Sequence, residues 1–551
     1  MIKETEREYT AEYKLFNFRP VFFFAVFLCL GIYFAYLCDC HGFLLWFCAF
    51  LPVILCLFSF FCRTKKRLIS TLVAVGSLLV AFAVGSGAYL AQTAAYKDCG
   101  KYHGERTVTV YGTVRSINEN ACILDGLIID GNAENGQLVA YLPGTFAEEV
   151  RVLDEVVLRG YVRTATDYFQ DGTINAYVIQ QDRRFILSDW TCEKIGREWK
   201  LFSEIRLHIE NVLYSHMDKT SAAVTLAVLT GNTDGMDAGL LQNMRYGGIA
   251  HVFAVSGLHI GAMYAFCLFI GKKIKIHRVP KWLRFAITAG VLLFYGAICG
   301  FSTSVIRATT MCLVLHFSRL WLTYNDPLET LGLAAIIVLA ISPVSLFSVG
   351  FQLSFAACLG IILFGRTFAR GCNRAYTHVK AKIRQNRGKP PVDERAHPPS
   401  VGDRIFRSAS GFFSASLAAQ IFTAPILLAA FGYISVWSLL LNCVFVPLIG
   451  AAFSVFLVYV ALACIFSFMG GIILYLPSVA WAVLLLCFQT LDFSQACLTG
   501  ICFWDGAFTL YYLGCSFLTD KWNIPKGYKN VFAAVCFLIF VLGACIVTFW
   551  M

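Results

Sequence analysis

The densest group of polar side chains in an apolar stretch lies at residues 251–261, HVFAVSGLHIG. Two histidines, His251 and His259, enclose Ser256 and Gly257. Polar side chains at membrane depth are costly unless they face a cavity or one another. Gly257 favours a break in the helix, which is tolerated where the backbone lines water or is buried in protein. The segment therefore suits the lining of a polar conduit, and a helix–helix packing seam of small residues is the alternative.

Ser256 and His259 also offer a nucleophile and a base, as an intramembrane hydrolase would need. Two such residues three positions apart on one segment seldom aim at each other, and no other histidine clearly supplies the base. The 22 cysteines form no C-x-x-C pair, so a zinc or redox motif is unsupported. We therefore expect no catalytic residue, no metal site and no cofactor, and we treat hydrolysis as the least favoured class.

Further polar residues interrupt the apolar runs that follow. Arg307 lies a few residues inside one of them, and an intramembrane arginine is a functional candidate by default. It could meet phosphate, or its side chain could extend to lipid headgroups. Gln352 and Asn442 could face a conduit or bond between helices. Asp326-Pro327 is typical of a helix start, with aspartate as the cap and proline at the first helical position.

The elements that must position these residues are membrane spans. The chain has 551 residues, of which 58% are apolar and only 14% charged, too few charges to cover the surface of a soluble protein. Candidate spans before residue 96 are 20–38, 43–62 and 68–92. Later candidate elements are 221–231, 250–271, 282–300, 303–321, 327–341, 344–365, 408–431, 434–462, 468–491, 506–519 and 530–549. Together with the three earlier spans they allow 11 to 13 crossings. Charge does not decide whether 434–462 is one helix or two half-helices.

The net charge of +11 is concentrated in a few clusters between apolar segments. Residues 63–67 carry four basic side chains, 272–281 carry five and no acid, and 366–407 carry eleven against three acids. The positive-inside rule places such loops in the cytoplasm, and counting crossings puts all of them on one side. The N-terminus is then cytoplasmic and the C-terminus outside. The 366–407 loop, with two Pro-Pro pairs, is expected to be poorly ordered.

Residues 96–192 change period and predict a small all-β domain outside the membrane. A barrel of about five strands of the OB type fits this length, and a sandwich fits as well. Residues 193–220 predict an amphipathic helix that either lies on the membrane surface or docks the β-domain. The span from 221 to 551 is then the transmembrane core.

The β-domain is acidic, with thirteen acidic and seven basic residues between positions 104 and 190, so phosphate tracking there is disfavoured. Single strands can instead be held by aromatic stacking, for which Tyr168 and Phe169 are the best candidates. The expectation for three other tyrosines, Tyr111, Tyr141 and Tyr161, is burial in the core. If the domain faces outward, one pair among Cys99, Cys122 and Cys192 could be oxidised.

The 251–261 segment resembles the H-x-x-A-V-S-G-L-H signature of ComEC-type competence proteins. Residues 300–308 (GFSTSVIRA), which include Ser302, Ser304 and Arg307, are similar to the family's G-x-S-P-S-x-x-R-A segment. Asp326-Pro327, Pro343 and the FQLSF block at 351–355 match the next block, and Pro425, Phe431, Asn442 and Pro447 follow in order. The resemblance covers nearly the whole chain.

The resemblance implies a polytopic α-helical protein of the bacterial plasma membrane with one small extracytoplasmic all-β (OB-like) domain. It also implies a channel that imports single-stranded DNA during natural transformation, lined by His251, Ser256, Gly257, His259, Ser302, Ser304, Arg307, Gln352 and Asn442. Its partners would be membrane lipid, a DNA receptor outside, a separate nuclease and a cytoplasmic ATPase or helicase. A small-molecule or ion transporter is the alternative, although acidic relay residues are nearly absent from the spans.

Two departures from the family pattern bear on these expectations. Thr303 stands where the family usually has proline, so the break in that helix is expected to be softer. Many relatives carry a C-terminal metallo-β-lactamase-like nuclease domain with an H-x-H-x-D-H motif, and this sequence has no such motif. The expectation is that the nuclease is a separate protein or is not needed.

The topology makes a direct prediction. Reporter fusions at Asp171, in the β-domain, and at Gln385, in the basic loop, should report opposite sides of the membrane. A result that places both positions on the same side contradicts the crossing count.

Overall fold

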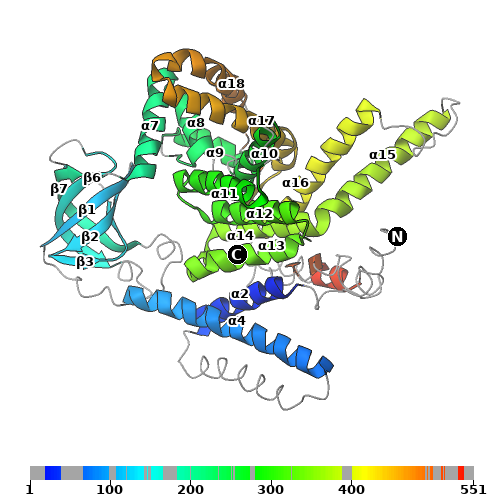
Figure 1. The fold of residues 1–551 in the computed structure, drawn as a ribbon, viewed down its shortest axis with the longest axis horizontal. Coiled ribbons are helices and arrows are strands. Elements are labelled where there is room, and N and C mark those ends of the chain that lie inside the picture. The colour runs from blue at the N-terminus through cyan, green and yellow to red at the C-terminus, as the bar shows by residue number, and fades with distance from the viewer. Residues whose placement is uncertain are drawn as a thin grey trace.

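In the computed structural model, a small β-barrel and a larger helical part are joined by helix α7 (Figure 1). The structure describes residues 19–38, 66–97, 107–118, 121–141, 145–146, 150–164, 183–198, 200–233, 235–249, 251, 255–273, 279–323, 325–386, 400–490, 493, 497–499, 511–512, 514–515 and 531–538. The predicted span 43–62 and the candidates Tyr168 and Phe169 lie outside these residues.

The β-domain closes into a barrel. Strand β1 pairs with β2 and β6, β6 pairs with β7, β7 with β4, and β4 with β2, so the ring of five strands is complete. The β4–β7 pairing is parallel and the others are antiparallel. The bounds are β1 (Thr107–Asn118), β2 (Ala121–Ile129), β3 (Asn132–Glu134), β4 (Gln137–Tyr141), β5 (Thr145–Phe146), β6 (Asp154–Thr164) and β7 (Arg183–Arg197). The predicted all-β domain is thereby confirmed.

Alternation along the strands fills the barrel with aliphatic side chains. On β1, Val108, Val110 and Val114 are at most 1% exposed and point inward, as a strand with one buried face requires. The prediction that Tyr111, Tyr141 and Tyr161 are buried is wrong, because these tyrosines lie on the outer face and are 44%, 43% and 40% exposed.

Cys122 and Cys192 lie in the barrel core as free thiols. Burial raises the pKa of the Cys122 thiol to about 12 and that of Cys192 to about 11. Both thiols therefore stay protonated at neutral pH and act as small apolar groups. Cys99, the third candidate for a disulfide, lies outside the described residues.

Strand β7 extends to Arg197, past the expected domain boundary at residue 192. Lys194 Nζ lies 2.9 Å from the buried carboxylate of Asp154 on the neighbouring strand, which holds this end of β7 in the sheet. The following helix α7 (Leu201–His216) packs against α8, α11, α17 and α18, with Val212 and Leu213 buried. These contacts favour a docking helix over one that lies on a lipid surface.

The helical part contains α2 (Pro20–Cys38), α4 (Lys66–Lys97), α8 (Lys219–Thr230), α9 (Ala238–Tyr246), α10 (Gly257–Lys273), α11 (Lys281–Ile298), α12 (Thr303–Trp321), α13 (Pro327–Ile341), α14 (Val349–Gly360), α15 (Arg366–Asn386), α16 (Val401–Phe431), α17 (Ser438–Ile465) and α18 (Gly470–Thr490). Short 3-10 turns lie at Pro343–Phe347 and Ser467–Met469, and a π-turn at Ile361–Gly365. A small β-ribbon pairs β8 (Tyr433–Ser435) with β9 (Cys497–Thr499).

Within the described residues, five helices are long and apolar enough to cross a membrane: Val75–Ala94, Lys281–Ile298, Val349–Ile383, Val401–Phe431 and Ser438–Ile465. Shorter apolar helices include Pro20–Tyr36 and Pro327–Ile341. Within the predicted segment 434–462, residues 438–462 belong to one helix, α17, which contains Pro447 in its interior, while residues 434–435 lie in β8. The mostly helical chain with one small β-domain agrees with the predicted fold class.

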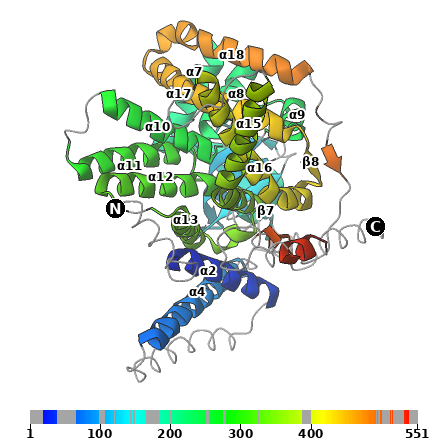
Figure 2. The same ribbon diagram turned by 90° about the vertical axis from the view of Figure 1, so that its right-hand side faces the viewer.

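The expectation of a poorly ordered loop over 366–407 is wrong for most of that segment. Helix α15 occupies Arg366–Asn386 and pairs with the first part of α16, which begins at Val401. The Tyr376 and Phe406 rings stack at 3.9 Å, and Ser410 Oγ donates to Asn373 Oδ1 at 3.1 Å. We call α15 and residues 401–414 the hairpin, which projects from the helical part (Figure 1) and faces the viewer in Figure 2.

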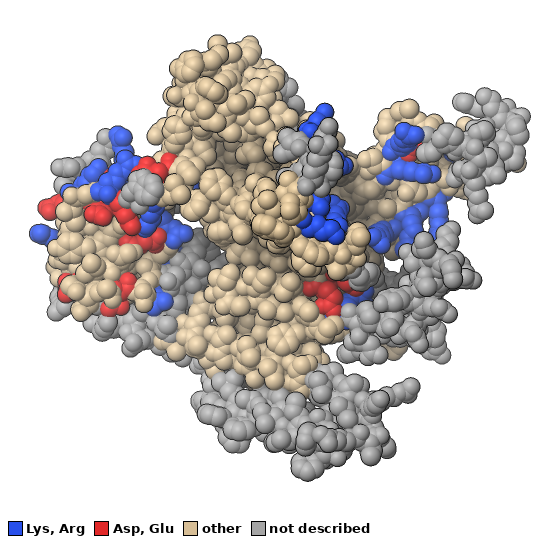
Figure 3. All heavy atoms as spheres, viewed as in Figure 1, with Lys and Arg blue, Asp and Glu red and all other residues tan. Residues whose placement is uncertain are grey.

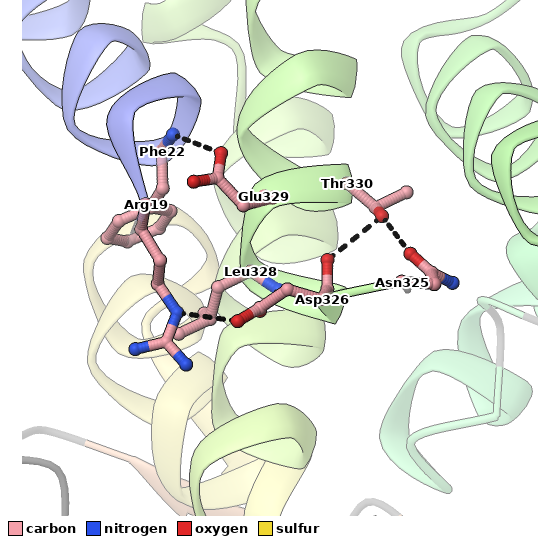
Figure 4. Close-up of polar contacts among 7 residues, drawn as sticks. All are labelled: Arg19, Phe22, Asn325, Asp326, Leu328, Glu329 and Thr330. Atoms are coloured by element: carbon pink, nitrogen blue, oxygen red, sulfur yellow. Dashed lines mark hydrogen bonds and ion pairs between the residues drawn. The ribbon is translucent and has the colours of Figure 1, made fainter. Parts of the chain in front are cut away.

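Asp326 starts α13 and also fastens the N-terminal helices to the core. Its carboxylate accepts from the Leu328 amide at 2.8 Å and from Arg19 Nε at 2.9 Å, while Pro327 occupies the first helical position (Figure 4). The Phe22 amide donates to Glu329 Oε2 at 3.2 Å. The predicted helix start is confirmed, and the same carboxylate joins α13 to α2.

We expect Asp326→Ala to lower the thermal unfolding temperature of the purified protein in detergent. It removes a helix cap that contributes about 1 kcal/mol, together with a partly buried ion pair. Asp237→Ala is the matched control, because Asp237 caps α9 by accepting from the Leu240 amide at 2.8 Å. Equal losses for the two variants would show that the pair with Arg19 contributes nothing.

Candidate functional site

Helix α10 begins at Gly257, so Gly257 is the start of a helix and not a break within one. The expected span over 250–271 therefore begins later than predicted. Ser256 caps α10: its Oγ accepts from the Leu258 amide at 3.2 Å, and its carbonyl accepts from the His259 amide at 3.1 Å. This cap satisfies donors at a helix end that lies inside the protein.

His259 completes the cap from the third helical position. Its Nδ1 accepts from the Ser256 amide at 3.0 Å. The serine side chain thus accepts from an amide of the first turn and the histidine side chain accepts from the amide of the serine, as in a capping box. The side chain is completely buried, and its ring meets that of Phe453 edge-on at 4.8 Å. Its Nε2 has no hydrogen-bond partner among the described residues.

Ser256 Oγ lies 3.2 Å from His259 Nδ1, so the expectation that the two residues would not aim at each other is wrong. The capping turn brings them together. In a serine–histidine–acid triad, however, Nε2 faces the serine and Nδ1 faces the acid. Here Nδ1 faces the serine and also accepts a backbone N–H, and within the described residues no carboxylate contacts the ring. The geometry is that of a cap.

A second short helix ends beside this segment. Every residue of α8 from Ser221 to Thr230 is buried, and the helix ends at Gly231 with a positive φ of 81°. A Cβ on Gly231 would lie 3.1 Å from the Val255 side chain. The end of α8 and the start of α10 are thus neighbours, in the manner of discontinuous helices inside membrane proteins.

Arg307 lies in α12 and is only 6% exposed. Its Nη1 donates to the Ser354 carbonyl at 2.7 Å and contacts the Cys358 thiol, and the guanidinium lies 5.8 Å from the Phe355 ring centroid. These contacts place it among protein groups and not at a lipid headgroup. Its Nε is buried without a hydrogen-bond partner, and no acidic residue pairs with it within the described part of the chain.

Gly257 packs directly against this arginine. A Cβ at position 257 would lie 3.1 Å from Arg307 Nη2, so the glycine allows the guanidinium to approach the first turn of α10. We call Arg307, Gly257, Ser354, Phe355 and Cys358 the Arg307 site. The site combines a guanidinium with the positive end of a helix dipole and holds only neutral acceptors, which is an arrangement that attracts an anion.

The GFSTSVIRA segment supplies the start of α12. Ser302 precedes the helix and is exposed, and Thr303 is its first residue. A proline would be accepted at that position, so threonine there does not soften a break, because the helix starts and is not interrupted. Ser304 Oγ lies 3.1 Å from Ser354 Oγ, which places Ser304 at the edge of the Arg307 site.

The remaining predicted residues lie elsewhere. Gln352 Nε2 donates to the Leu346 carbonyl at 3.1 Å, across the turn before its own helix. Asn442 Nδ2 donates to Ser438 Oγ at 3.4 Å, and Gln420 of α16 donates to the same hydroxyl at 2.6 Å. Asn442 therefore belongs to a polar seam between α16 and α17. His251, the first residue of the 251–261 segment, is exposed.

The sequence analysis overlooked a second polar group, between α10 and α12. Tyr264 Oη lies 3.3 Å from His316 Nδ1, and Arg319 Nη1 donates to the same tyrosine at 3.5 Å. His316 is 5% exposed. A histidine and an arginine three residues apart in an apolar span are the signal that could have revealed this group. Within the described residues no three His, Cys, Asp or Glu side chains come together as metal ligands would.

Comparison with known proteins places the Arg307 site inside a family region. Residues 228–523 match the model of a family described as "Competence protein". The chain is 26% identical over 323 residues to ComE operon protein 3 of Bacillus subtilis (strain 168). That alignment covers 58% of this chain and 36% of the relative, so the chain matches little more than a third of the relative's length. No solved structure matches.

Proposed function

The chain belongs to the competence protein family, and on that premise we propose that it is a multi-pass protein of the bacterial plasma membrane that passes single-stranded DNA across it. The proposed role is a conduit without catalysis, used in the uptake of DNA during natural transformation. The single observation that carries this proposal is the buried Arg307, which has no acidic partner among the residues that the structure describes.

The chemistry of Arg307 favours phosphate as the transported group. Burying a guanidinium costs on the order of several kcal/mol unless charge and hydrogen bonds compensate it. Here a carbonyl, a thiol and an aromatic ring compensate it in part, and Nε remains free. An anion with several oxygens would satisfy both Arg307 and the start of α10. A phosphate of the DNA backbone has that chemistry.

The proposed path needs irregular backbone at membrane depth, because a phosphate strand cannot cross hydrocarbon. The neighbouring ends of α8 and α10 supply such backbone, and the Ser256 cap satisfies it. We propose that Ser256, Gly257, His259, Ser304 and Arg307 line this path. His251 and Ser302, both exposed, would lie towards one end of it.

We propose that the barrel is of the OB type and lies outside the cell, with the hairpin in the cytoplasm. The strand ring and its parallel β4–β7 pair support that type. A DNA receptor would deliver the strand, a separate nuclease would degrade its complement, and a cytoplasmic ATPase or helicase would draw it in. Membrane lipid surrounds the helical part.

Uptake of labelled DNA in a deletion strain tests the conduit. We expect Gly257→Leu to abolish uptake at normal protein levels, because the side chain would displace Arg307, and Arg307→Gln to lower uptake at least tenfold. Gly257→Ala is the matched control: its Cβ would lie 3.1 Å from the end of the flexible Arg307 side chain and at ordinary contact distance, 3.6 Å, from Ala308 Cβ, so most uptake should remain. Normal uptake by Arg307→Gln contradicts the proposed site.

A hydrolase is the second candidate function, because Ser256 Oγ lies 3.2 Å from His259 Nδ1. The variant Ser256→Ala distinguishes it from the conduit. Loss of the cap costs about 1 kcal/mol, and substantial uptake should remain. The purified protein should show no hydrolytic activity with or without divalent metal. An activity that disappears in Ser256→Ala would establish the hydrolase instead.

For the barrel we propose that Tyr168 and Phe169 stack on bases of the strand. In the full-length protein, Tyr168→Ala with Phe169→Ala should weaken oligonucleotide binding by about 1–3 kcal/mol per stacked base. The ratio of wild-type to variant affinity should not change with salt, because stacking releases few counterions. Tyr475→Ala, which removes a 70% exposed tyrosine on α18, is the control, and an equal loss there excludes a specific role for the pair.

A further inference from the structure

The Arg307 site and the hairpin share one continuous rod. Helix α14 passes through the π-turn at Ile361–Gly365 into α15 without a break. The stretch Val349–Ile383 has 35 residues, or about 52 Å at ~1.5 Å per residue, against a hydrocarbon layer of about 30 Å. One end of the rod contributes Ser354 and Cys358 to the Arg307 site. The other end is α15, which projects beyond the rest of the helical part (Figure 1).

A row of basic side chains follows α15. Arg366, Arg370, Arg374, His378 and Lys382 recur at intervals of four residues, and all are exposed. Residues four apart are neighbours on a helix surface, so successive members are separated by about 6 Å along the axis. We call these five residues the basic stripe. Lysine and arginine side chains gather on the projecting hairpin in Figure 3.

No acid offsets the stripe within the described residues. Helix α15 contains no aspartate or glutamate. The nearest acid of the hairpin, Asp403, is occupied by Lys380, Tyr376 and the Ser400 cap. Arg370 Nε donates to the Arg366 carbonyl of its own helix at 3.3 Å. The four arginine and lysine side chains of the stripe therefore form a fixed row of cations that favours a long polyanion.

The contacts that hold α15 against α16 do not involve the basic side chains of the stripe. The stacked Tyr376 and Phe406 rings and the Asn373–Ser410 hydrogen bond lie between α15 and α16. They involve none of the stripe residues. The cationic groups are thus presented by a helix that is already ordered, so little further ordering is needed when a ligand binds.

We propose that the basic stripe binds the phosphate backbone of the single strand that leaves the Arg307 site, and so guides it away from the membrane. This inference rests on the proposed function and adds to it a second, exit-side contact. Anionic lipid has similar phosphate chemistry, but its field falls off within a Debye length of about 8 Å. The stripe extends about 24 Å along its helix, which is about three times that reach if the rod continues straight out of the bilayer.

Salt dependence of binding gives the test. The full-length protein in nanodiscs of neutral phosphatidylcholine would be titrated with a fluorescent oligothymidylate at several salt concentrations. Neutralising three members in Arg370→Gln/Arg374→Gln/Lys382→Gln should lower the slope of log K against log salt by about 2, since each phosphate contact on a single strand contributes ~0.7. The charge-preserving set Arg370→Lys/Arg374→Lys/Lys382→Arg should keep the wild-type slope.

The matched control removes equal charge elsewhere. Lys272, Lys273 and Lys281 are exposed at the ends of α10 and α11, and changing all three to glutamine should leave the slope within experimental error. An unchanged slope in the stripe variant overturns the inference. So does a defect that appears only in nanodiscs containing phosphatidylglycerol, because the stripe would then be a lipid contact.

The two proposals can fail separately. If the stripe variant binds normally while Arg307→Gln abolishes uptake, the stripe is wrong and the conduit stands. If the stripe variant loses salt-dependent binding while Arg307→Gln takes up DNA normally, the stripe stands as a nucleic-acid contact and the Arg307 site is wrong.

Discussion

A positive charge that is buried without a negative partner in the described part of the chain is the constraint on which the helical core depends. Arg307 is held by a backbone carbonyl, a thiol and an aromatic ring, each of which compensates only part of a guanidinium's lost hydration. Hydrophobic packing alone would select against such a residue. Its neighbours accommodate it: position 257 is a glycine, which leaves room for the guanidinium, and the Ser354 carbonyl accepts a hydrogen bond from Nη1. A site this costly is most easily explained by an anion that visits it.

The backbone at the start of α10 likewise places polar groups inside the protein that need partners. A helix that begins inside the protein exposes amides that need acceptors. Ser256 and His259 provide them reciprocally, which removes the need for a carboxylate at this position. An acidic cap would have neutralised Arg307 and closed the site to phosphate. The serine and histidine of the motif therefore supply the acceptors without adding a negative charge beside Arg307.

Much of this arrangement could be predicted from the sequence, wherever local chemistry and tertiary structure agree. Helices α12 and α13 have the predicted bounds because Asp326-Pro327 and the polar GFS segment mark their starts. The start of α10 was misplaced because a capping serine and a helical serine look alike inside an apolar run. The hairpin was missed because its stability comes from α16, whose Phe406 and Ser410 are distant in sequence from Tyr376 and Asn373. The outward tyrosines of the barrel were missed because strand alternation does not state which face is inside.

The proposed transport adds a requirement to the site that anion binding alone does not. A site that held phosphate too tightly would stop a strand, so conduction favours contacts that are several and individually weak. Arg307 already donates to protein acceptors, which lowers what it can offer a phosphate. The stripe residues are exposed, where each charge interaction is screened by water and salt. One rod thus links the two groups: Ser354 near its inner end accepts from the partly satisfied Arg307 of α12, and the row of screened cations follows its outer part, α15. A polyanion moving along it would exchange similar contacts at each step and meet no deep minimum.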